Sequence, residues 1–314
     1  MPDIRPQISM QVRTFTDDVD YDWSIMLDAA RAMDAADVDR LVVSDHIAFG
    51  DDPNAAYANP ATGGTAGGHQ PTGPDGLWLE PLTVLTAVAA VTKNIRLGTA
   101  ILLAALRRPA VLAKTAATID VLSGGRLDLG VGVGWQREEY EAVGLSFEER
   151  GRTLDHTLDV CRALWTQTRA SYASPELTFD GIHQMPKPVQ PGGIPIWVSG
   201  TVNNAVARRI ARFKAGWIPW GADLADPARS IAAMRKRVSD AGGDPAAMPV
   251  QGYARVVTQS DRTLDIDATM ASVPALIDAG VTDVRVTCAV PPDQATAIEF
   301  LSEVVAAFRS TTTG

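Results

Sequence analysis

The sequence contains few cysteines, and it has no excess of positive charge. Among its 314 residues only Cys161 and Cys288 are cysteines, and they form neither a disulfide framework nor a metal-binding pattern. A reduced, cytoplasmic setting is therefore the simplest expectation. The net charge of −9 argues against nucleic acid as a partner, because binding of nucleic acid needs a basic face.

Long apolar runs and catalytic histidine patterns are also lacking. No run approaches the roughly 20 apolar residues that span a membrane, and the first residues contain no apolar signal-peptide segment, so we expect no membrane partner. The four histidines include no His-x-His pair, which disfavours a metal-dependent hydrolase, and we expect no bound metal. A Gly-x-Ser-x-Gly motif is absent, so covalent hydrolysis is unsupported.

What the chain does contain is a series of short apolar runs that end in polar residues. The clearest four, each with the polar residues that follow it, are residues 41–46, 95–101, 127–138 and 194–201. Parallel strands that are buried on both faces have this uniformly apolar character. When such strands close into a barrel, functional side chains collect at their C-terminal ends. The pattern therefore predicts both a fold and the position of a site.

Eight strands alternate with eight helices along the chain. The predicted strands are residues 7–13, 40–44, 95–102, 126–132, 195–198, 216–219, 250–257 and 284–287. The predicted helices are residues 22–36, 80–93, 109–123, 147–165, 203–213, 226–241, 270–279 and 292–308. Strict alternation is typical of a (β/α)₈ TIM barrel and of a doubly wound sheet. We prefer the barrel, as one domain over residues 1–314, because the count is eight and no second domain is visible.

Two insertions interrupt the alternation. Residues 49–77, after the second strand, are rich in Gly, Pro, Ala, Asn and Thr and lie on the face where the site is expected. A loop of this length is usually a functional lid, and a passive insert is the alternative. Residues 166–193, before the fifth strand, end in a proline-rich stretch that favours an extended backbone.

Alternating glycines mark the fourth strand. Gly130, Gly132 and Gly134 do not fit the dinucleotide-binding motif GxGxxG, because Trp135 stands where the third glycine of that motif is needed. Glycines in a strand can allow a planar ligand to approach the backbone. They can equally reflect tight packing inside a barrel, and the sequence leaves both interpretations open.

Polar residues at two strand ends are candidates for chemistry. His46 can carry a proton near neutral pH and Asp45 can orient it, although a purely structural hydrogen-bonded pair is the alternative. Gly200 and Thr201 lead into a helix, and the free N–H groups at a helix start attract anions. Asn203 can cap that helix, and capping alone is the more common arrangement.

Tryptophan is concentrated near the predicted strand ends. Aromatic walls with few polar groups suit a flat heterocyclic ligand. We expect Trp135 and Trp220 to lie at the barrel mouth and Trp197 to be buried.

These motifs together resemble the bacterial luciferase-like monooxygenase superfamily, in its coenzyme F420-dependent branch. The similar stretches are residues 44–46, 97–102, 112–126, 130–135, 138–140, 150–152, 188–198 and 215–219. The run Ser-Gly-Gly-Arg-Leu-x-Leu-Gly-Val-Gly-x-Gly-Trp, residues 123–135, is quite specific to the superfamily and less specific to the cofactor. The similarity is weakest after about residue 225.

The resemblance implies a deazaflavin or flavin in the barrel mouth, with its ring against the ends of the third and fourth strands. It also implies a non-prolyl cis peptide bond between Ala100 and Ile101, and a cofactor phosphate near residues 200–202. The cofactor-binding residues implied in this way are Asp45, His46, Thr99, Ala100, Ile101, Gly134, Trp135, Ser199, Gly200, Thr201, Val202 and Trp220.

The resemblance also implies a reaction. Related dehydrogenases have a histidine at the position of His46 that contacts the ring or acts as a base, and an acidic residue where this chain has Trp135. We therefore expect His46, Asp45 and Glu138 to be catalytic, in an F420-dependent oxidoreductase that transfers a hydride to or from a small organic substrate. The alternatives are an FMN-dependent monooxygenase of the same fold and a non-catalytic flavin- or deazaflavin-binding protein. Relatives commonly form homodimers, so we expect this protein to form a homodimer.

Overall fold

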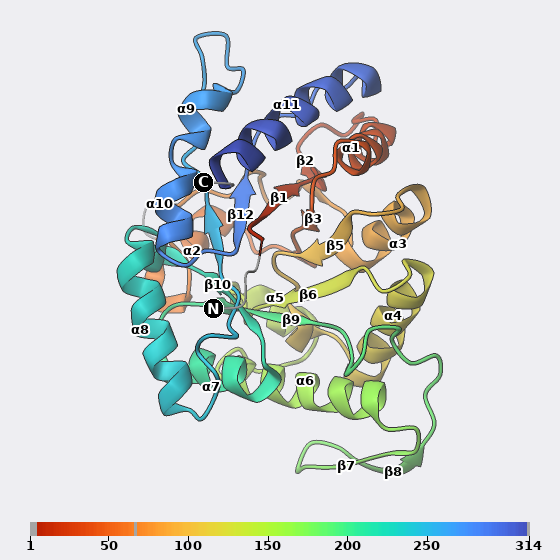
Figure 1. Ribbon diagram of the computed structural model, residues 1–314. Helices are drawn as coiled ribbons and strands as arrows, with labels where there is room; N and C mark the ends of the chain where they lie inside the picture. The colour runs from red at the N-terminus through yellow and green to blue at the C-terminus, as the bar shows by residue number, and fades with distance from the viewer. Residues whose placement is uncertain (1–4, 66–67, 313–314) are drawn as a thin grey trace.

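Eight parallel strands form a barrel in the computed structural model, which describes residues 5–65 and 68–312. Their order around the barrel is β10–β9–β6–β5–β3–β1–β12–β11, and a bridge between Trp217 and Val250 joins β10 to β11 and closes the ring (Figure 1). The strands are β1 (Gln7–Gln11), β3 (Arg40–Val43), β5 (Arg96–Thr99), β6 (Leu127–Val131), β9 (Ile196–Gly200), β10 (Gly216–Pro219), β11 (Gln251–Tyr253) and β12 (Asp283–Val286). The predicted (β/α)₈ barrel is confirmed.

Helices cover the outside of the barrel. They are α1 (Ser24–Ala35), α3 (Pro81–Val91), α4 (Pro109–Leu122), α6 (Arg150–Thr166), α7 (Asn204–Phe213), α8 (Pro227–Asp240), α9 (Ile266–Met270), α10 (Val273–Asp278) and α11 (Gln294–Thr312). One helix was predicted over residues 270–279, and α10 forms there over a shorter range, while α9 precedes it and ends at Met270. Pro274 lacks the N–H that would continue the hydrogen-bond ladder to Met270. No helix of the described residues is long and apolar enough to cross a membrane.

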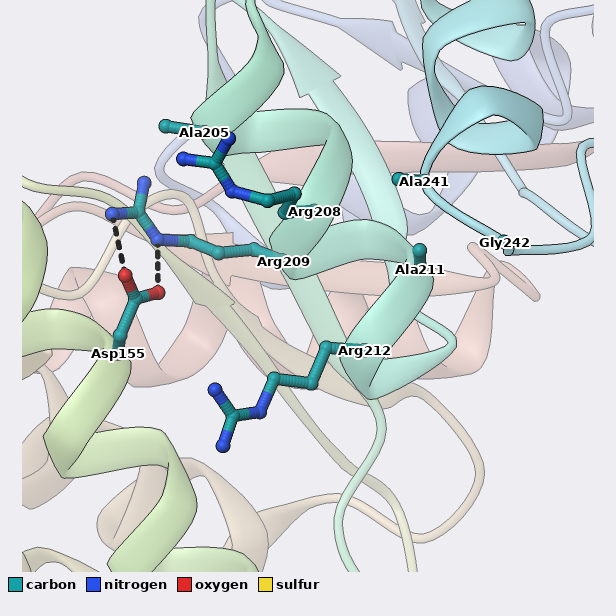
Figure 2. Close-up of a pocket in the computed structure, with 8 residues that line it drawn as sticks. All are labelled: Asp155, Ala205, Arg208, Arg209, Ala211, Arg212, Ala241 and Gly242. Carbon is teal, nitrogen blue, oxygen red and sulfur yellow. Dashed lines mark hydrogen bonds and ion pairs between the residues drawn. The ribbon is translucent and has the colours of Figure 1, made fainter.

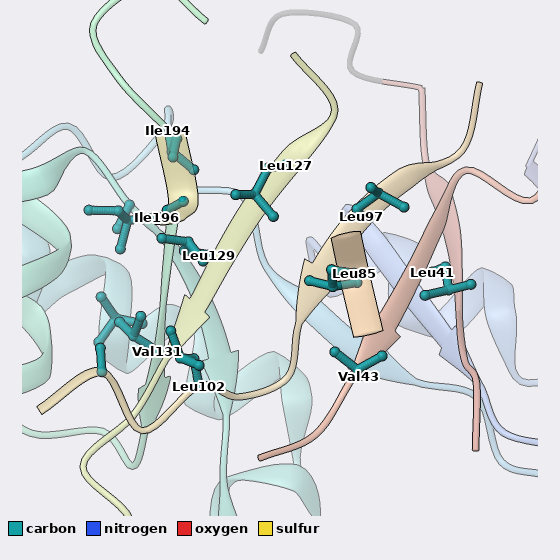
Figure 3. Close-up of a cluster of buried hydrophobic side chains, with 14 of the residues drawn as sticks. Leu41, Val43, Leu85, Leu97, Leu102, Leu127, Leu129, Val131, Ile194 and Ile196 are labelled. Carbon is teal, nitrogen blue, oxygen red and sulfur yellow. The ribbon is translucent and has the colours of Figure 1, made fainter. Parts of the chain in front are cut away.

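Apolar strand side chains pack against these helices and form the main core. Leu41 and Val43 of β3, Leu97 of β5 and Leu85 of α3 belong to one cluster of buried hydrophobic residues (Figure 3). Alternate strand positions point to opposite sides of the sheet, so the residues between them face the barrel interior. The uniformly apolar strands that the sequence predicts therefore have a physical cause, since both of their faces are covered.

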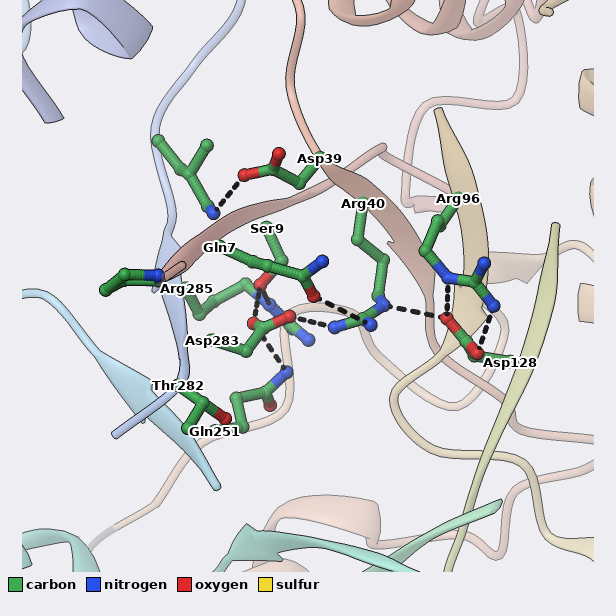
Figure 4. Close-up of polar contacts among 12 residues, drawn as sticks. Gln7, Ser9, Asp39, Arg40, Arg96, Asp128, Gln251, Thr282, Asp283 and Arg285 are labelled. Carbon is green, nitrogen blue, oxygen red and sulfur yellow. Dashed lines mark hydrogen bonds and ion pairs between the residues drawn. The ribbon is translucent and has the colours of Figure 1, made fainter. Parts of the chain in front are cut away.

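A buried network of charges fills the end of the barrel where the strands begin. The Arg40 guanidinium contacts Asp283 and also donates to Asp128 at 3.0 Å, and Arg96 donates to Asp128 at 2.6 and 2.7 Å (Figure 4). Arg40 also lies 4.8 Å above the ring of Trp197. Because charged and aromatic side chains occupy this end, the opposite end of the barrel is left for a functional site.

The two insertions have secondary structure of their own. Residues 49–77 contain α2 (Pro53–Tyr57) and the 3₁₀ helix η1 (Pro60–Thr62), and they lead into β4 (Leu77–Trp78), which pairs with β2 (Phe15–Thr16). Residues 66–67 of the first insertion lie outside the described part. The second insertion contains a hairpin of β7 (Ala170–Ala173) and β8 (Thr178–Ile182).

Candidate active site

His46 and Glu139 form a buried pair at the C-terminal end of the barrel. The Nδ1 atom of His46 lies 3.2 Å from Oε1 of Glu139, and the N–H of Ile47 donates to the same oxygen at 2.9 Å. Glu139 comes from α5 (Arg137–Ala142), which follows β6. The two side chains are 10% and 1% exposed. Oε2 of Glu139 is also buried, and no hydrogen-bond partner lies near it within the described residues. The pair can hold or transfer a proton in a site shielded from water.

The expectation that Asp45 orients His46 is wrong. The Asp45 carboxylate accepts a hydrogen bond from the N–H of Leu103 at 2.8 Å and from the Arg107 guanidinium at 2.6 and 3.1 Å. The two residues are adjacent in the chain after β3, but their side chains contact different partners and diverge. Asp45 instead fixes the segment that follows β5, through Leu103 and Arg107.

The structure also corrects the expectation that Glu138 is the acidic partner. Glu138 is exposed, and its side chain lies against the backbone of Gly50, where a Cβ atom would come within 2.7 Å of its Cγ atom. Neighbouring residues on a helix point about 100° apart, which directs Glu138 outward and Glu139 inward. Two consecutive glutamates in the sequence indicate an acidic partner for His46, but only the orientation of α5 shows that Glu139 is the one that contacts it.

Aromatic side chains surround His46. Its ring centroid lies 4.7 Å from that of Phe49, 4.8 Å from that of Trp78 and 5.4 Å from that of Trp135. Trp135 is buried beside it, as is Trp197 elsewhere in the barrel, so the prediction that Trp197 is buried is confirmed.

The first insertion supplies much of this aromatic surface. The Tyr57 ring contacts the rings of Trp135 and Trp220 at centroid distances of 5.2 and 6.1 Å. Nε1 of Trp220 donates a hydrogen bond to the carbonyl oxygen of Gly63 at 2.9 Å. Burial raises the pKa of Tyr57, even though a hydrogen bond with Thr65 opposes the shift. Residues of the insertion therefore cover both His46 and the tryptophan that follows β10.

The chain makes a bulge directly after β5. The peptide bond between Ala100 and Ile101 is cis, as the resemblance implies. Gly98 pairs with Asp128, and Leu102 pairs with Val131. The chain therefore advances four residues from β5 onward while β6 advances three. An extra residue of this kind bends a strand and redirects its side chains.

The alternating glycines of β6 accommodate this bulge. A Cβ atom on Gly130 would lie 2.0 Å from the carbonyl oxygen of Thr99, and one on Gly132 would lie 2.5 Å from Cδ1 of Ile101. Gly134 has φ +71°, a conformation that residues with side chains rarely adopt. Close packing within the barrel therefore explains Gly130 and Gly132.

The predicted anion-binding site at the start of α7 is partly occupied by side chains of the chain itself. Asn203 caps α7, as predicted, because its Oδ1 atom accepts from the N–H groups of Ala205 and Val206 at 2.9 and 3.0 Å. The N–H of Val202 donates to the Asp223 carboxylate at 2.6 Å. Side chains of the chain itself therefore already accept hydrogen bonds from three backbone amides in this segment, and the phosphate site at residues 200–202 stays a prediction.

The remaining predicted residues lie around the same barrel end. Ser199 and Gly200 end β9, and the latter has φ +152° and accepts a hydrogen bond from Nε1 of Trp217 at 2.9 Å. Thr201 is exposed, and its Cγ2 atom is 4.0 Å from the position of a Cβ atom on Gly221. Since Gly221 follows Trp220, the start of α7 adjoins the aromatic cluster that covers His46.

A separate cavity of about 340 Å³ lies outside the barrel, between α6, α7 and the end of α8 (Figure 2). Arg209 is buried there and binds Asp155 through Nε and Nη2, at 2.5 and 3.3 Å. Arg208 and Arg212 are exposed on the same helix. The cavity is lined by ion-paired and surface arginines and does not adjoin His46.

Comparison with known proteins identifies the family. The model of the luciferase-like monooxygenase family matches residues 22–273. The chain belongs to the luciferase-like monooxygenase family. Members of this family are oxidoreductases and monooxygenases, so the resemblance found in the sequence is confirmed.

Two curated relatives come from Mycobacterium tuberculosis. An uncharacterized protein is 40% identical over 155 residues, 49% of this chain, and the chain spans only 55% of that protein's length. A phthiodiolone/phenolphthiodiolone dimycocerosates ketoreductase is 32% identical over 199 residues, which are 62% of this chain and 51% of that protein.

Two solved structures share the whole fold. An F420-dependent secondary alcohol dehydrogenase, in complex with an F420-acetone adduct, has a TM-score of 0.73 at 17% identity, covering 97% of this chain and 99% of that one. A type II Baeyer–Villiger monooxygenase from Pseudomonas putida, in complex with FMN, has a TM-score of 0.71 at 14% identity, covering 98% of each chain. At such identities the likeness shows the fold alone.

Proposed function

We propose that this luciferase-like protein is an F420-dependent oxidoreductase that interconverts a small ketone and the corresponding secondary alcohol. The observation that carries the proposal is the buried His46–Glu139 pair beneath an aromatic cover at the C-terminal end of the barrel. Reduction of a ketone by hydride needs a proton as well, and a histidine held by a carboxylate can supply it. The names of a ketoreductase relative and of an alcohol dehydrogenase with the same fold support this substrate class.

The residues around the bulge and at the start of α7 would hold the cofactor. Its ring would lie against residues 99–101, with Gly134, Trp135, Asp45 and His46 nearby, and its phosphate against residues 199–202, with Trp220 beside it. When bound, the deazaflavin supplies the hydride.

The protein's own groups have three tasks in this proposal. Glu139 orients His46 and stabilises the protonated ring, while His46 exchanges the proton with the substrate oxygen. Asp45 anchors the segment after β5 through Leu103 and Arg107. The lid, residues 49–77, excludes water by covering His46 with Phe49.

Cofactor titrations test the proposal directly. We expect F420 to bind more tightly than FMN, and we expect loaded enzyme to reduce small ketones without consuming oxygen. His46→Ala should retain F420 binding and lower turnover by about 10²-fold or more, in the range of general acid catalysis. Tight FMN binding with oxygen uptake would replace this proposal by the FMN-dependent monooxygenase. Cofactor binding without turnover of any ketone or alcohol would favour a non-catalytic binding protein. The homodimer and the cytoplasmic location stay predictions.

A further inference from the structure

Arg285 is a buried cation inside the barrel that has no carboxylate partner among the described residues. The residue is 3% exposed. Its Nε atom donates a hydrogen bond to the hydroxyl of Ser9 at 3.2 Å, while its Nη2 atom is buried without a hydrogen-bond partner in the described part of the chain (Figure 4). A buried guanidinium with unused N–H groups costs free energy, unless a ligand accepts from them.

The other two arginines of the interior do have carboxylate partners. Arg40 contacts both Asp283 and Asp128, and Arg96 contacts Asp128. Within this network three arginines therefore share two carboxylates, and the positive charge that is left over falls on Arg285. Buried charges in proteins are almost always paired, so this one calls for an anion that the described chain does not supply.

Arg285 lies on the side of the network that faces the barrel mouth. It follows Asp283 by two residues along β12, on the same face of the strand and nearer to its C-terminal end. The Cζ atom of Arg285 is 5.7 Å from the ring of Tyr253, which pairs with it from β11 and is 37% exposed. Arg285 therefore lies directly behind a side chain that solvent reaches.

Tyr253 in turn adjoins the first insertion. Burial raises the pKa of Tyr57, and the nearby Tyr253 adds to the rise. Tyr57 also contacts the ring of Trp135, which lies beside His46. A ligand beneath the insertion therefore has His46 on one side and Tyr253, backed by Arg285, on the other.

We propose that Arg285 binds a carboxylate of the substrate, so that the enzyme interconverts a keto acid and the corresponding hydroxy acid. The inference rests on the proposed function and narrows its substrate class. The planar guanidinium can donate two parallel hydrogen bonds to one carboxylate. The carboxylate stays unchanged in the reaction, because the hydride and the proton still go to the carbonyl carbon and oxygen.

The strand order limits the length of such a substrate. His46 follows β3 and Arg285 belongs to β12, and these two strands flank β1. The usual spacing of neighbouring strands separates them by about 10 Å. A chain of a few carbon atoms can therefore place its carboxylate at Arg285 and its carbonyl group at His46.

Acids and their amides provide matched substrates of equal size. The test uses 4-oxopentanoate, 5-oxohexanoate and 6-oxoheptanoate with the three corresponding amides, as substrates of enzyme loaded with reduced F420. We expect kcat/KM for the best acid to exceed that for its amide by about 10- to 100-fold, the range for hydrogen bonds to a charged group. Calorimetric titration of the complex with oxidised F420 should give a similar ratio of dissociation constants.

Replacement of Arg285 should remove this preference. In Arg285→Met we expect the acid-to-amide ratio to fall to about one, while the affinity for F420 stays unchanged. The melting temperature should not fall, because an apolar side chain of similar volume replaces an unpaired buried charge. Arg285→Lys keeps the charge without the planar fork and should retain part of the preference, and it serves as the second variant if Arg285→Met does not fold.

Arg209→Met is the matched control. Arg209 is also buried, but it binds Asp155 in the separate cavity outside the barrel. We expect this variant to keep the acid-to-amide ratio of the wild type. An equal fall of the ratio in Arg209→Met and Arg285→Met would show that the preference does not depend on Arg285.

The outcomes separate the inference from the proposed function. If wild-type enzyme reduces acids and amides equally well, the inference is wrong and the proposed function stands. If Arg285→Met weakens F420 binding and leaves the ratio unchanged, the anion that Arg285 binds belongs to the cofactor, and the inference is overturned. If acids bind in an Arg285-dependent way but no ketone or alcohol is turned over, the proposed reaction fails while carboxylate binding by Arg285 is supported.

Discussion

At the scale of single residues, the direction of a side chain decides its role at the barrel mouth. Asp45 and His46 are adjacent in the chain, yet one binds Arg107 and the other binds Glu139. Glu138 and Glu139 are also adjacent, and only the second is buried. Residue type and position along the sequence therefore identify the neighbourhood of the site, but not the partner of its histidine.

The two glutamates give a matched pair of variants. We expect Glu139→Gln to lower kcat at least about tenfold, as loss of a group that orients a functional residue commonly does. Glu138→Gln should leave kcat unchanged. Equal losses of kcat in the two variants, measured by steady-state kinetics, would contradict the assignment of Glu139.

The glycines of β6 are a second residue-scale feature. They were compatible with a nearby ligand or with tight packing, and the carbonyl of Thr99 and the side chain of Ile101 account for Gly130 and Gly132. The register shift after β5 creates these contacts, so their cause lies in the neighbouring strand and not in β6 itself.

At the scale of elements, hydrogen bonds and ring contacts tie the first insertion to the barrel at several points. Near its end β4 pairs with β2, and the rings of Trp78 and Phe15 stack at a centroid distance of 4.5 Å. In its middle, Gly63 accepts the hydrogen bond from Trp220. Opening of residues 53–65 requires the contact between Gly63 and Trp220 to break, which is the behaviour that we propose for a lid.

The variant Trp220→Phe tests whether the hydrogen bond to Gly63 holds the insertion closed. The variant keeps an aromatic ring beside Tyr57 but loses the hydrogen bond to Gly63. Such a bond contributes about 1 kcal/mol, so its loss should make amide exchange over residues 53–65 roughly fivefold faster. Trp165→Phe is the control, because it loses an equivalent bond to the carbonyl of Ala113 far from the lid. Hydrogen-exchange mass spectrometry should find selective acceleration only in the first variant. If amide exchange over residues 53–65 were equally fast in the two variants, the hydrogen bond between Trp220 and Gly63 would not be what holds the insertion closed.

At the scale of the whole molecule, the barrel is polar at one end and aromatic at the other. Arg40, Arg96 and Arg285 share the interior with Asp128 and Asp283, and burial lowers the pKa of Arg40 and Arg285. Such a network is costly to form and still more costly to break, since each group is withdrawn from water.

Asp283→Asn should therefore destabilise the protein by about 3–5 kcal/mol, because Arg40 loses a buried carboxylate partner. The control is Asp240→Asn, whose exposed pair with Lys236 contributes less than about 1 kcal/mol. Urea denaturation measures both changes in the free energy of unfolding. We expect the slope of this free energy against urea concentration to be the same in the two variants. A similar small loss in both would mean that the network contributes little to stability.

The order of the eight strands and helices could be predicted from local patterns in the sequence, because apolar runs, capping residues and prolines act locally. The sequence also located the site, since parallel strands bring all their C-terminal ends to one side of the barrel. The cap of α7 at Asn203 followed from local rules, and the cis bond at Ala100 followed from the family resemblance.

Which side chains contact one another depends on the three-dimensional packing of the chain. Glu139 reaches His46 from α5, Asp223 reaches Val202 from η3, and Trp220 reaches Gly63 across the barrel mouth. These partners are separated by 93, 21 and 157 residues. No local pattern encodes such contacts, because they depend on how helices and loops are rotated about the closed barrel.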